Sequence, residues 1–221
     1  MRQRISRIEN AGPDLRARRI FFEHDPEPRV TAAAVVKKLG VEVGLEVDRD
    51  DFEARLAAEE RPLAKERALQ LIGYRERSAH ELKTKLRDAG FPANVAAEVV
   101  ARYVEVELVD DERFANAWVR SRRSAGYGDR KILRELVDRG VDPALASAAL
   151  EDEDDGEIER AVDALRGRRP RDYADSQRLI KRLISRGFSL SAARAAVELS
   201  GRSQELDADG ADYGDTVDDL Q

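Results

Sequence analysis

One pattern recurs three times in the second half of the chain. Two apolar residues lie four positions apart, Gly follows four positions later, and another apolar residue comes directly after it. The copies are Leu82–Leu86–Gly90–Phe91, Ile132–Leu136–Gly140–Val141 and Leu179–Leu183–Gly187–Phe188. Their glycines are 50 and 47 residues apart. A repeat of this length predicts a tandem array of small supersecondary units, an architecture typical of extended binding surfaces.

Each unit is expected to contain three helices. Counted from its glycine, the first helix places apolar or small residues 26 and 22 positions earlier: Ala64/Ala68, Phe114/Trp118 and Ala161/Leu165. The second helix begins at an N-cap type of residue: Ser78, Gly128-Asp129 or Asp175-Ser176. The third helix buries one residue: Val100, Leu150 or Val197. The glycine ends the second helix in the left-handed conformation, which other residues adopt at a cost of about 1 kcal/mol or more.

The first 63 residues lack this pattern. Short segments in which apolar and polar residues alternate predict a small antiparallel sheet. They are Ile5–Ile8, Arg19–Glu23 and Arg29–Thr31. Two helices are expected to follow, Thr31–Leu39 ending at Gly40 and Asp50–Glu60, which Pro62 closes.

The predicted fold is therefore mainly α. A small N-terminal β/α region (1–63) precedes three three-helix repeats (64–110, 111–155 and 156–200), and a disordered acidic tail (201–221) ends the chain. Stacking of the repeats would give an elongated, curved body with a continuous core.

Charge is distributed unevenly along the chain. The formal net charge is −6, and residues 201–221 carry all of it. Residues 113–139 hold eight bases against three acids, and residues 160–200 hold ten against four. This asymmetry indicates a polyanionic partner for the basic surfaces. The acidic stretch 151–159 is either a flexible joint or a solvated helix start. The tail is either a solubilising segment or a mimic of DNA charge that shields the basic faces.

Several classes of site are excluded or disfavoured. The chain has no Cys and two His, His24 and His80, far apart in sequence. It has no phosphate-binding glycine loop and no metal-ligand spacing. The adjacent Asp110 and Asp111 could bind a metal, but an N-cap before the next helix explains them better. We therefore expect no enzyme activity and no cofactor. Because no signal core or membrane-spanning segment is present, we expect a cytoplasmic protein.

The helix expected at Asp111–Ser124 is the most informative element. Phe114 and Trp118 share a stripe that should be core, whereas Asn116 and several arginines lie on the opposite side. A loop with an aromatic residue between two glycines follows, and then a further basic helix. The candidate partner-binding residues are Arg113, Arg120, Arg123, Tyr127, Arg130 and Lys131. A solvated helix face with a Gly C-cap explains them equally well.

At these residues the chain resembles the RecX family, bacterial regulatory proteins that modulate the RecA recombinase. In the first unit the resemblance rests on Glu76-Arg-Ser78-Ala-His-Glu81-Leu82, Lys85-Leu86 and Gly90-Phe91. It rests more heavily on Leu108-Val-Asp110-Asp111-Glu-Arg113-Phe114-Ala115, Ser121-Arg122, Gly126-Tyr127-Gly128, Ile132, Glu135-Leu136 and Gly140-Val141. It covers residues 64–200, although the third unit matches only in apolar spacing, and residues 5–60 resemble the leading domain of longer members more weakly.

The resemblance implies a function in DNA repair and recombination. Family members are not enzymes: they bind RecA and its nucleoprotein filament, lie in the filament groove, and inhibit ATP turnover and strand exchange. The implied partners are thus RecA and its DNA filament, with weak direct DNA affinity and no membrane, and we expect a monomer. The alternative is a helical protein that binds single- or double-stranded DNA directly, whose affinity would fall steeply with salt.

Overall fold

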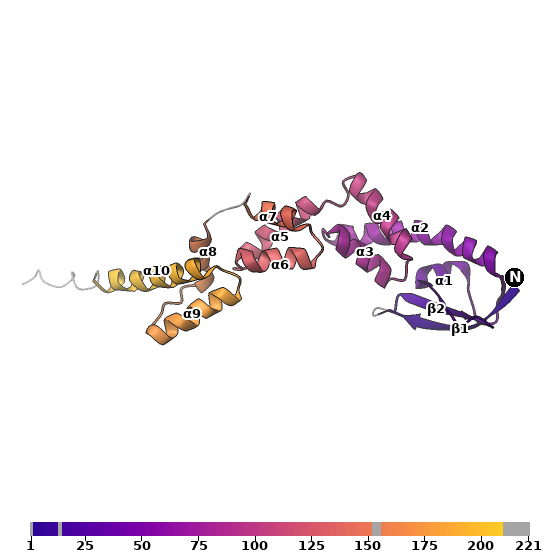
Figure 1. Cartoon of the computed structure of the whole chain (residues 1–221), viewed down its shortest axis with the longest axis horizontal. Helices are drawn as coiled ribbons and strands as arrows, with labels where there is room; N and C mark the ends of the chain where they lie inside the picture. The colour runs from indigo at the N-terminus through magenta and orange to yellow at the C-terminus, as the bar shows by residue number, and fades with distance from the viewer. Residues whose placement is uncertain (1, 13–14, 152–155, 210–221) are drawn as a thin grey trace, which may run out of the picture. The chain divides into compact units, whose positions relative to one another are not determined.

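The computed structural model describes residues 2–12, 15–151 and 156–209. It divides into unit 1, Met1–Phe114, and unit 2, Ala115–Gln221 (Figure 1). As the sequence predicts, the chain is mainly helical, with a small antiparallel sheet at its N-terminus. No helix within the described residues is long and apolar enough to cross a membrane.

The sheet of unit 1 has the strand order β3-β2-β1-β4, with every neighbouring pair antiparallel. The strands are β1 (Arg2–Ala11), β2 (Ala17–Phe22), β3 (Arg29–Ala32) and β4 (Glu46–Asp48). The first three were predicted; β4 was not, because three residues are too few to show an alternation. Helix α1 (Ala33–Leu39) ends at Gly40, whose φ is 61°, as expected.

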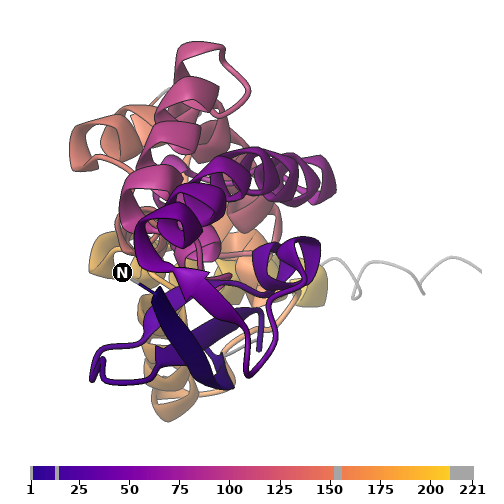
Figure 2. The same ribbon diagram turned by 90° about the vertical axis from the view of Figure 1, so that its right-hand side faces the viewer.

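Helix α2 (Arg49–Tyr74) contradicts the prediction that Pro62 closes a helix. It runs without a break through Pro62 and across the expected domain boundary at residues 63/64. An interior proline costs about 3 kcal/mol, but contacts on both sides hold this helix. Phe52 and Leu56 are buried before Pro62, and Ala64 and Ala68 after it, all in one hydrophobic cluster. Figure 2 shows α2, in purple, beside the indigo strands.

A buried carboxylate near the middle of α2 ties the helix to the sheet. Glu60 is 1% exposed. It accepts hydrogen bonds from Arg29 Nη2 at 2.9 Å and from Thr31 Oγ1 at 2.7 Å. The sheet and the first repeat therefore pack together within unit 1.

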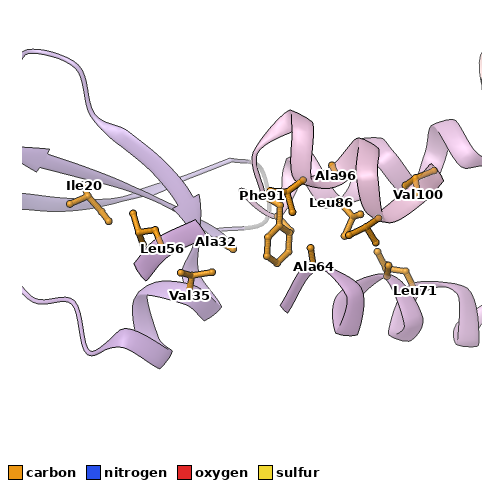
Figure 3. Packing of buried hydrophobic residues seen from close by; sticks show 14 of the residues in the cluster. Ile20, Ala32, Val35, Leu56, Ala64, Leu71, Leu86, Phe91, Ala96 and Val100 are labelled. Carbon is orange, nitrogen blue, oxygen red and sulfur yellow. The ribbon is translucent and has the colours of Figure 1, made fainter. Parts of the chain in front are cut away.

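The first repeat consists of the second half of α2 with α3 (Ala79–Asp88) and α4 (Ala93–Glu105). Ser78 caps α3 as expected, since its Oγ accepts from Glu81 N–H at 3.0 Å. At the other end, Gly90 N–H donates to the carbonyl of Arg87 and Phe91 N–H to that of Leu86, at 2.9 and 3.2 Å. These two bonds define a Schellman motif. In Figure 3 the Phe91 ring points toward Ala64, within the cluster that also holds Ala32 and Leu86.

The same motif closes the second helix of the other two repeats. Val141 N–H donates to Leu136 O at 3.1 Å, and Phe188 N–H to Leu183 O at 3.2 Å. Gly90, Gly140 and Gly187 have φ values of 93°, 74° and 99°. The predicted left-handed stops are therefore confirmed, and the recurring pattern is a helix-ending motif with its hydrophobic contact.

Helix α5 (Asp111–Ser124) begins in unit 1 and continues into unit 2. The remaining helices are α6 (Asp129–Asp138), α7 (Pro143–Glu151), α8 (Glu157–Leu165), α9 (Tyr173–Ser185) and α10 (Leu190–Asp209). Helix α9 begins earlier than predicted, because Asp172 rather than Asp175 or Ser176 is its N-cap. Val100 and Val197 are buried as expected, whereas Leu150 is only half-buried.

Two acidic segments are described only in part. For residues 156–159 of the stretch 151–159 the helix-start interpretation holds, since α8 begins at Glu157. Glu151 is the last residue of α7, and residues 152–155 lie outside the described residues. The tail was expected to be disordered from residue 201, but α10 continues to Asp209. An Arg202–Glu198 ion pair of 2.6 Å, one turn apart, supports this extension. Residues 210–221 lie outside the described residues.

Replacement of Gly90 tests whether the repeat glycine is needed for packing as well as for its backbone angle. A Cβ there would lie 2.7 Å from both Ala17 Cβ and Thr31 O, whereas one at Gly40 would meet nothing within 4 Å. Both glycines have positive φ. We expect Gly90→Ala to lower the free energy of unfolding by about 1–3 kcal/mol more than Gly40→Ala. Urea unfolding followed by circular dichroism measures both, and equal losses would contradict the packing role.

Candidate functional site

The paired acids Asp110 and Asp111, at the start of α5, have structural roles. Asp110 Oδ1 accepts from the backbone N–H groups of Glu112 and Arg113 at 2.9 and 3.0 Å, so it caps α5. Asp111 Oδ1 accepts from Ala79 N–H at 2.8 Å, at the start of α3. The N-cap interpretation is confirmed for Asp110, while Asp111 serves a neighbouring helix. Among the described residues no group of three or more His, Cys, Asp or Glu side chains is arranged to hold a metal.

Arg113 lies in unit 1, apart from the other five candidate residues, which belong to unit 2. Its side chain is 46% exposed and pairs with Glu76 and, at 3.8 Å, with Asp110. The hydrogen bond to Glu76 raises the pKa of Arg113 further above its ordinary value. Arg113 is thus on the surface but already engaged by its own unit.

Arg123 was expected on an exposed basic face, and the structure contradicts this. It is 9% exposed, and its Nε lies 3.1 Å from Asp129 Oδ1. Its Nη2 also donates to Leu150 O at 2.9 Å. The helical periodicity of α5 correctly predicts that Arg120 is exposed. It contains no information about the elements further along the chain that cover Arg123.

Asp129 is the centre of a joint between the second and third repeats. Besides Arg123, it receives Arg160 of α8, with Nη1–Oδ1 and Nη2–Oδ2 distances of 2.8 and 2.9 Å. Burial opposes ionisation of Asp129, but the hydrogen bonds and positive charges of Arg160 and Arg123 outweigh it and hold its pKa below the ordinary value. The aspartate therefore stays ionised and binds two buried guanidinium groups.

The loop between α5 and α6 completes the joint through backbone contacts. Gly128 N–H donates to Arg186 O at 2.9 Å, and Arg130 N–H to Gly187 O at 3.1 Å. A Cβ at Gly128 would lie 2.6 Å from Gly187 O, and one at Gly187 would lie 2.5 Å from Lys131 Cβ. Both positions require glycine because two backbones meet there. The loop is therefore packed against the third repeat through its backbone.

Tyr127, between Gly126 and Gly128, is half-buried under cations. Arg122 and Lys131 lie 4.1 and 4.3 Å from its ring centroid, and Arg186 of α9 lies at 5.4 Å. These are cation–π distances. The ring thus gathers positive charge from both repeats at one place on unit 2.

Trp118 was predicted to be core but is only half-buried. Its ring stacks under Arg139, 3.8 Å from the centroid, and its Nε1 donates to Glu135 at 3.2 Å. Ala115 and Val119, both fully buried, fill the core stripe beside Phe114 instead. The spacing of 22 positions before the repeat glycine identifies the correct face of the helix. It does not predict how deeply each side chain is buried.

Of the predicted contact residues, Arg120 and Arg130 are exposed and Lys131 is half-exposed. Arg120 lines a groove of about 420 Å³ that also includes Gly126, Arg160 and Arg166. Sequence reasoning missed Asp129, Arg160 and Arg186 as parts of this surface. The excess of basic over acidic residues within 160–200 was a signal for Arg160 and Arg186. Their partners, Asp129 and Gly126, lie 31 and 60 residues away in the sequence.

Substitution of Asp129 tests the joint. Because its pKa is lowered in the folded state, its ionised form stabilises unit 2 above the unfolded pKa, and that stability is lost as the pH falls through the folded pKa. Asp129→Asn leaves two buried guanidiniums without their carboxylate, so we expect a loss of about 3 kcal/mol at pH 7. We also expect a flatter stability profile below about pH 4. Thermal unfolding measures both effects.

Asp138→Asn is the matched control, since Asp138 is exposed on the same helix. It should change stability by less than about 0.5 kcal/mol. Equal effects of the two substitutions would show that the joint does not stabilise the unit.

Comparison with known proteins gives a consistent result. The family model for the first three-helix domain of RecX matches residues 64–102, and that for the second three-helix domain matches residues 110–150. These spans cover most of the helical residues of the first two repeats. They include Asp110 and Asp111 at the start of α5 and the glycine-flanked Tyr127.

Relatives and solved structures agree with the family models. The chain is 39% identical over 147 residues to the regulatory protein RecX of Mycolicibacterium smegmatis. The aligned stretch covers 62% of this chain and 78% of that protein. It is 36% identical over 135 residues to that of Xanthomonas campestris pv. campestris, covering 59% and 83%. The crystal structure of RecX from Lactobacillus salivarius shares the fold, with a TM-score of 0.54, 21% identity, and coverage of 68% and 99%. The chain belongs to the RecX family of regulatory proteins.

Proposed function

We propose that this chain regulates a RecA recombinase without catalysis, by binding the protein and its nucleoprotein filament in the cytoplasm. Binding would lower ATP turnover and strand exchange. The observation that carries this proposal is the likeness, over more than three quarters of their length, to relatives named regulatory protein RecX. The functions described for the family come to this chain through that likeness.

The physical features of unit 2 support a binding role. The joint around Asp129 holds two repeats together, so exposed side chains on both can act as one preorganised surface. We assign contacts with the recombinase to Arg120, Arg130 and Lys131, with Tyr127 holding Lys131 in place at 4.3 Å. Arg123 is reassigned to positioning, because its guanidinium is buried against Asp129. Arg113 stays a candidate contact on unit 1.

The chain is proposed to act as a monomer. Two basic repeats in one unit already offer several contacts that bind at the same time, and linked contacts raise affinity without requiring a second copy.

Measurement of the DNA-dependent ATPase of RecA tests the proposal. Wild-type protein should inhibit the ATPase at stoichiometric ratios. The triple variant Arg120→Ala/Arg130→Ala/Lys131→Ala removes three charges from the proposed contact surface without touching the Asp129 joint. We expect half-inhibition to require about tenfold more of this variant, equivalent to about 1.4 kcal/mol of binding free energy.

A charge-matched control distinguishes the loss of specific contacts from the loss of net positive charge. Arg55, Lys83 and Arg87 are exposed on unit 1, and their replacement by Ala removes the same charge elsewhere. This control should inhibit like wild type. An unchanged ATPase with stoichiometric wild-type protein would refute the regulator proposal and favour the alternative of a protein that acts on DNA alone.

A further inference from the structure

A groove of about 810 Å³ on the third repeat is lined mainly by arginine. It is formed by the α8–α9 loop and by α9. Its charged lining residues are Arg168, Arg169, Arg171, Arg178, Arg182, Asp172 and Asp175. All five arginines are exposed. We call this feature the arginine groove.

The two aspartates of the groove are occupied by the backbone. Asp172 accepts from Asp175 N–H at 2.7 Å as the N-cap of α9, and Asp175 accepts from Arg171 N–H at 3.3 Å. Within the described part of the chain no ion pair joins a carboxylate to Arg168, Arg178 or Arg182. These three arginines therefore carry positive charge that no described carboxylate offsets.

The charges in and beside the groove act on one another. The positive charge of Arg168, then loss of hydration, then the charges of Arg186 and Arg166 lower the pKa of Arg182. Like charges that are close together repel and oppose the compact state. An anionic segment seated in the groove would relieve this repulsion.

The sequence of the same unit supplies a matching negative charge. Residues 160–200 hold ten bases against four acids, and residues 201–221 hold seven acids against one base, so the two excesses are equal and opposite. Four of these acids lie within the 12 residues 210–221, which contain no base: Asp212, Asp215, Asp218 and Asp219. We call residues 210–221, which lie outside the described residues, the acidic segment.

Helix α10 leads the chain past the groove on its way to the acidic segment. It packs against α8 and α9 (Figure 1). A Cβ at Gly201 would lie 3.4 Å from Pro170 Cγ, and Pro170 stands between Arg169 and Arg171 of the groove. From Gly201 to Asp209 the helix rises about 12 Å, whereas 12 extended residues span up to about 40 Å. The acidic segment is therefore long enough to return to the groove.

We infer that the arginine groove is the docking site of the chain's own acidic segment. Carboxylate and guanidinium groups form strong, charge-assisted hydrogen bonds. Because both partners belong to one chain, the segment is present at an effective concentration of about a millimolar, so weak individual contacts are enough to hold it. The docked segment controls the access of other anions to the third repeat, since they have to displace it.

This contact distinguishes between the two interpretations of the tail. A purely solubilising segment needs no complementary groove, whereas a shielding segment needs one within reach. The inference goes beyond the proposed regulation of RecA, because it concerns a contact within one chain and requires no recombinase.

Binding of a fluorescent peptide with the sequence of residues 210–221 tests the inference, because an occupied groove cannot take up a second copy of the segment. Replacement of Asp212, Asp215, Asp218 and Asp219 by Asn in the full chain removes the charge of its own segment and changes no residue of the described fold. At low salt we expect the peptide to bind this Asn variant at least about tenfold more tightly than wild type.

Substitutions in the groove locate the binding. In the Asn variant, Arg168→Gln/Arg182→Gln should weaken peptide binding at least about tenfold. Arg168→Lys/Arg182→Lys keeps both charges and should retain most of the affinity, which shows that the fold is intact. Arg134→Gln/Arg194→Gln is the matched control, since both arginines are exposed in the same unit but do not line the groove. It should bind the peptide within about twofold of the Asn variant.

Three results would overturn the inference. Equal peptide affinity of wild type and the Asn variant would show that the segment does not occupy the groove. Equal losses in the groove and control variants would show that net charge alone attracts the peptide. Sedimentation of wild type as a dimer and of the Asn variant as a monomer would indicate docking onto a second copy instead. Failure of wild-type protein to inhibit RecA would refute the proposed function and leave this result standing.

Discussion

Close approach between backbones at the repeat glycines is the constraint on which the packing of both units depends. Gly90 brings the first repeat against the sheet at Ala17 and Thr31, and Gly187 brings the third repeat against Gly128 and Lys131 of the second. At each place the Schellman motif has already turned the chain at the end of a helix. The same residue therefore ends a helix and provides the space that lets its repeat contact the preceding structure.

Once the second and third repeats meet in this way, their charges sort into two groups. Inside the joint, Asp129 pairs with both Arg123 and Arg160, whose side chains are buried there and are not exposed to a partner. Arg120, Arg130 and several arginines of α9 and of the loop before it stay on the surface. Position relative to the joint, rather than the number of bases in a helix, thus decides which cations can bind a polyanion.

Local signals in the sequence predicted local structure well. The Gly stops, the Ser78 cap, three of the strands and the mainly helical fold all depend on residues within a few positions of one another. The errors came from long-range contacts. Pro62 remains inside a helix because packing on both sides outweighs its cost. Arg123 is buried because residues of α6 and α7 cover it, and no helical wheel contains that information.

The central claim is that unit 2 provides the contact surface for a RecA filament on single-stranded DNA. Hydrogen–deuterium exchange of the full chain, free and mixed with such filaments, tests it most directly. The account predicts slower exchange in residues 120–131, with the strands of unit 1 unchanged. Slower exchange confined to unit 1 would contradict it.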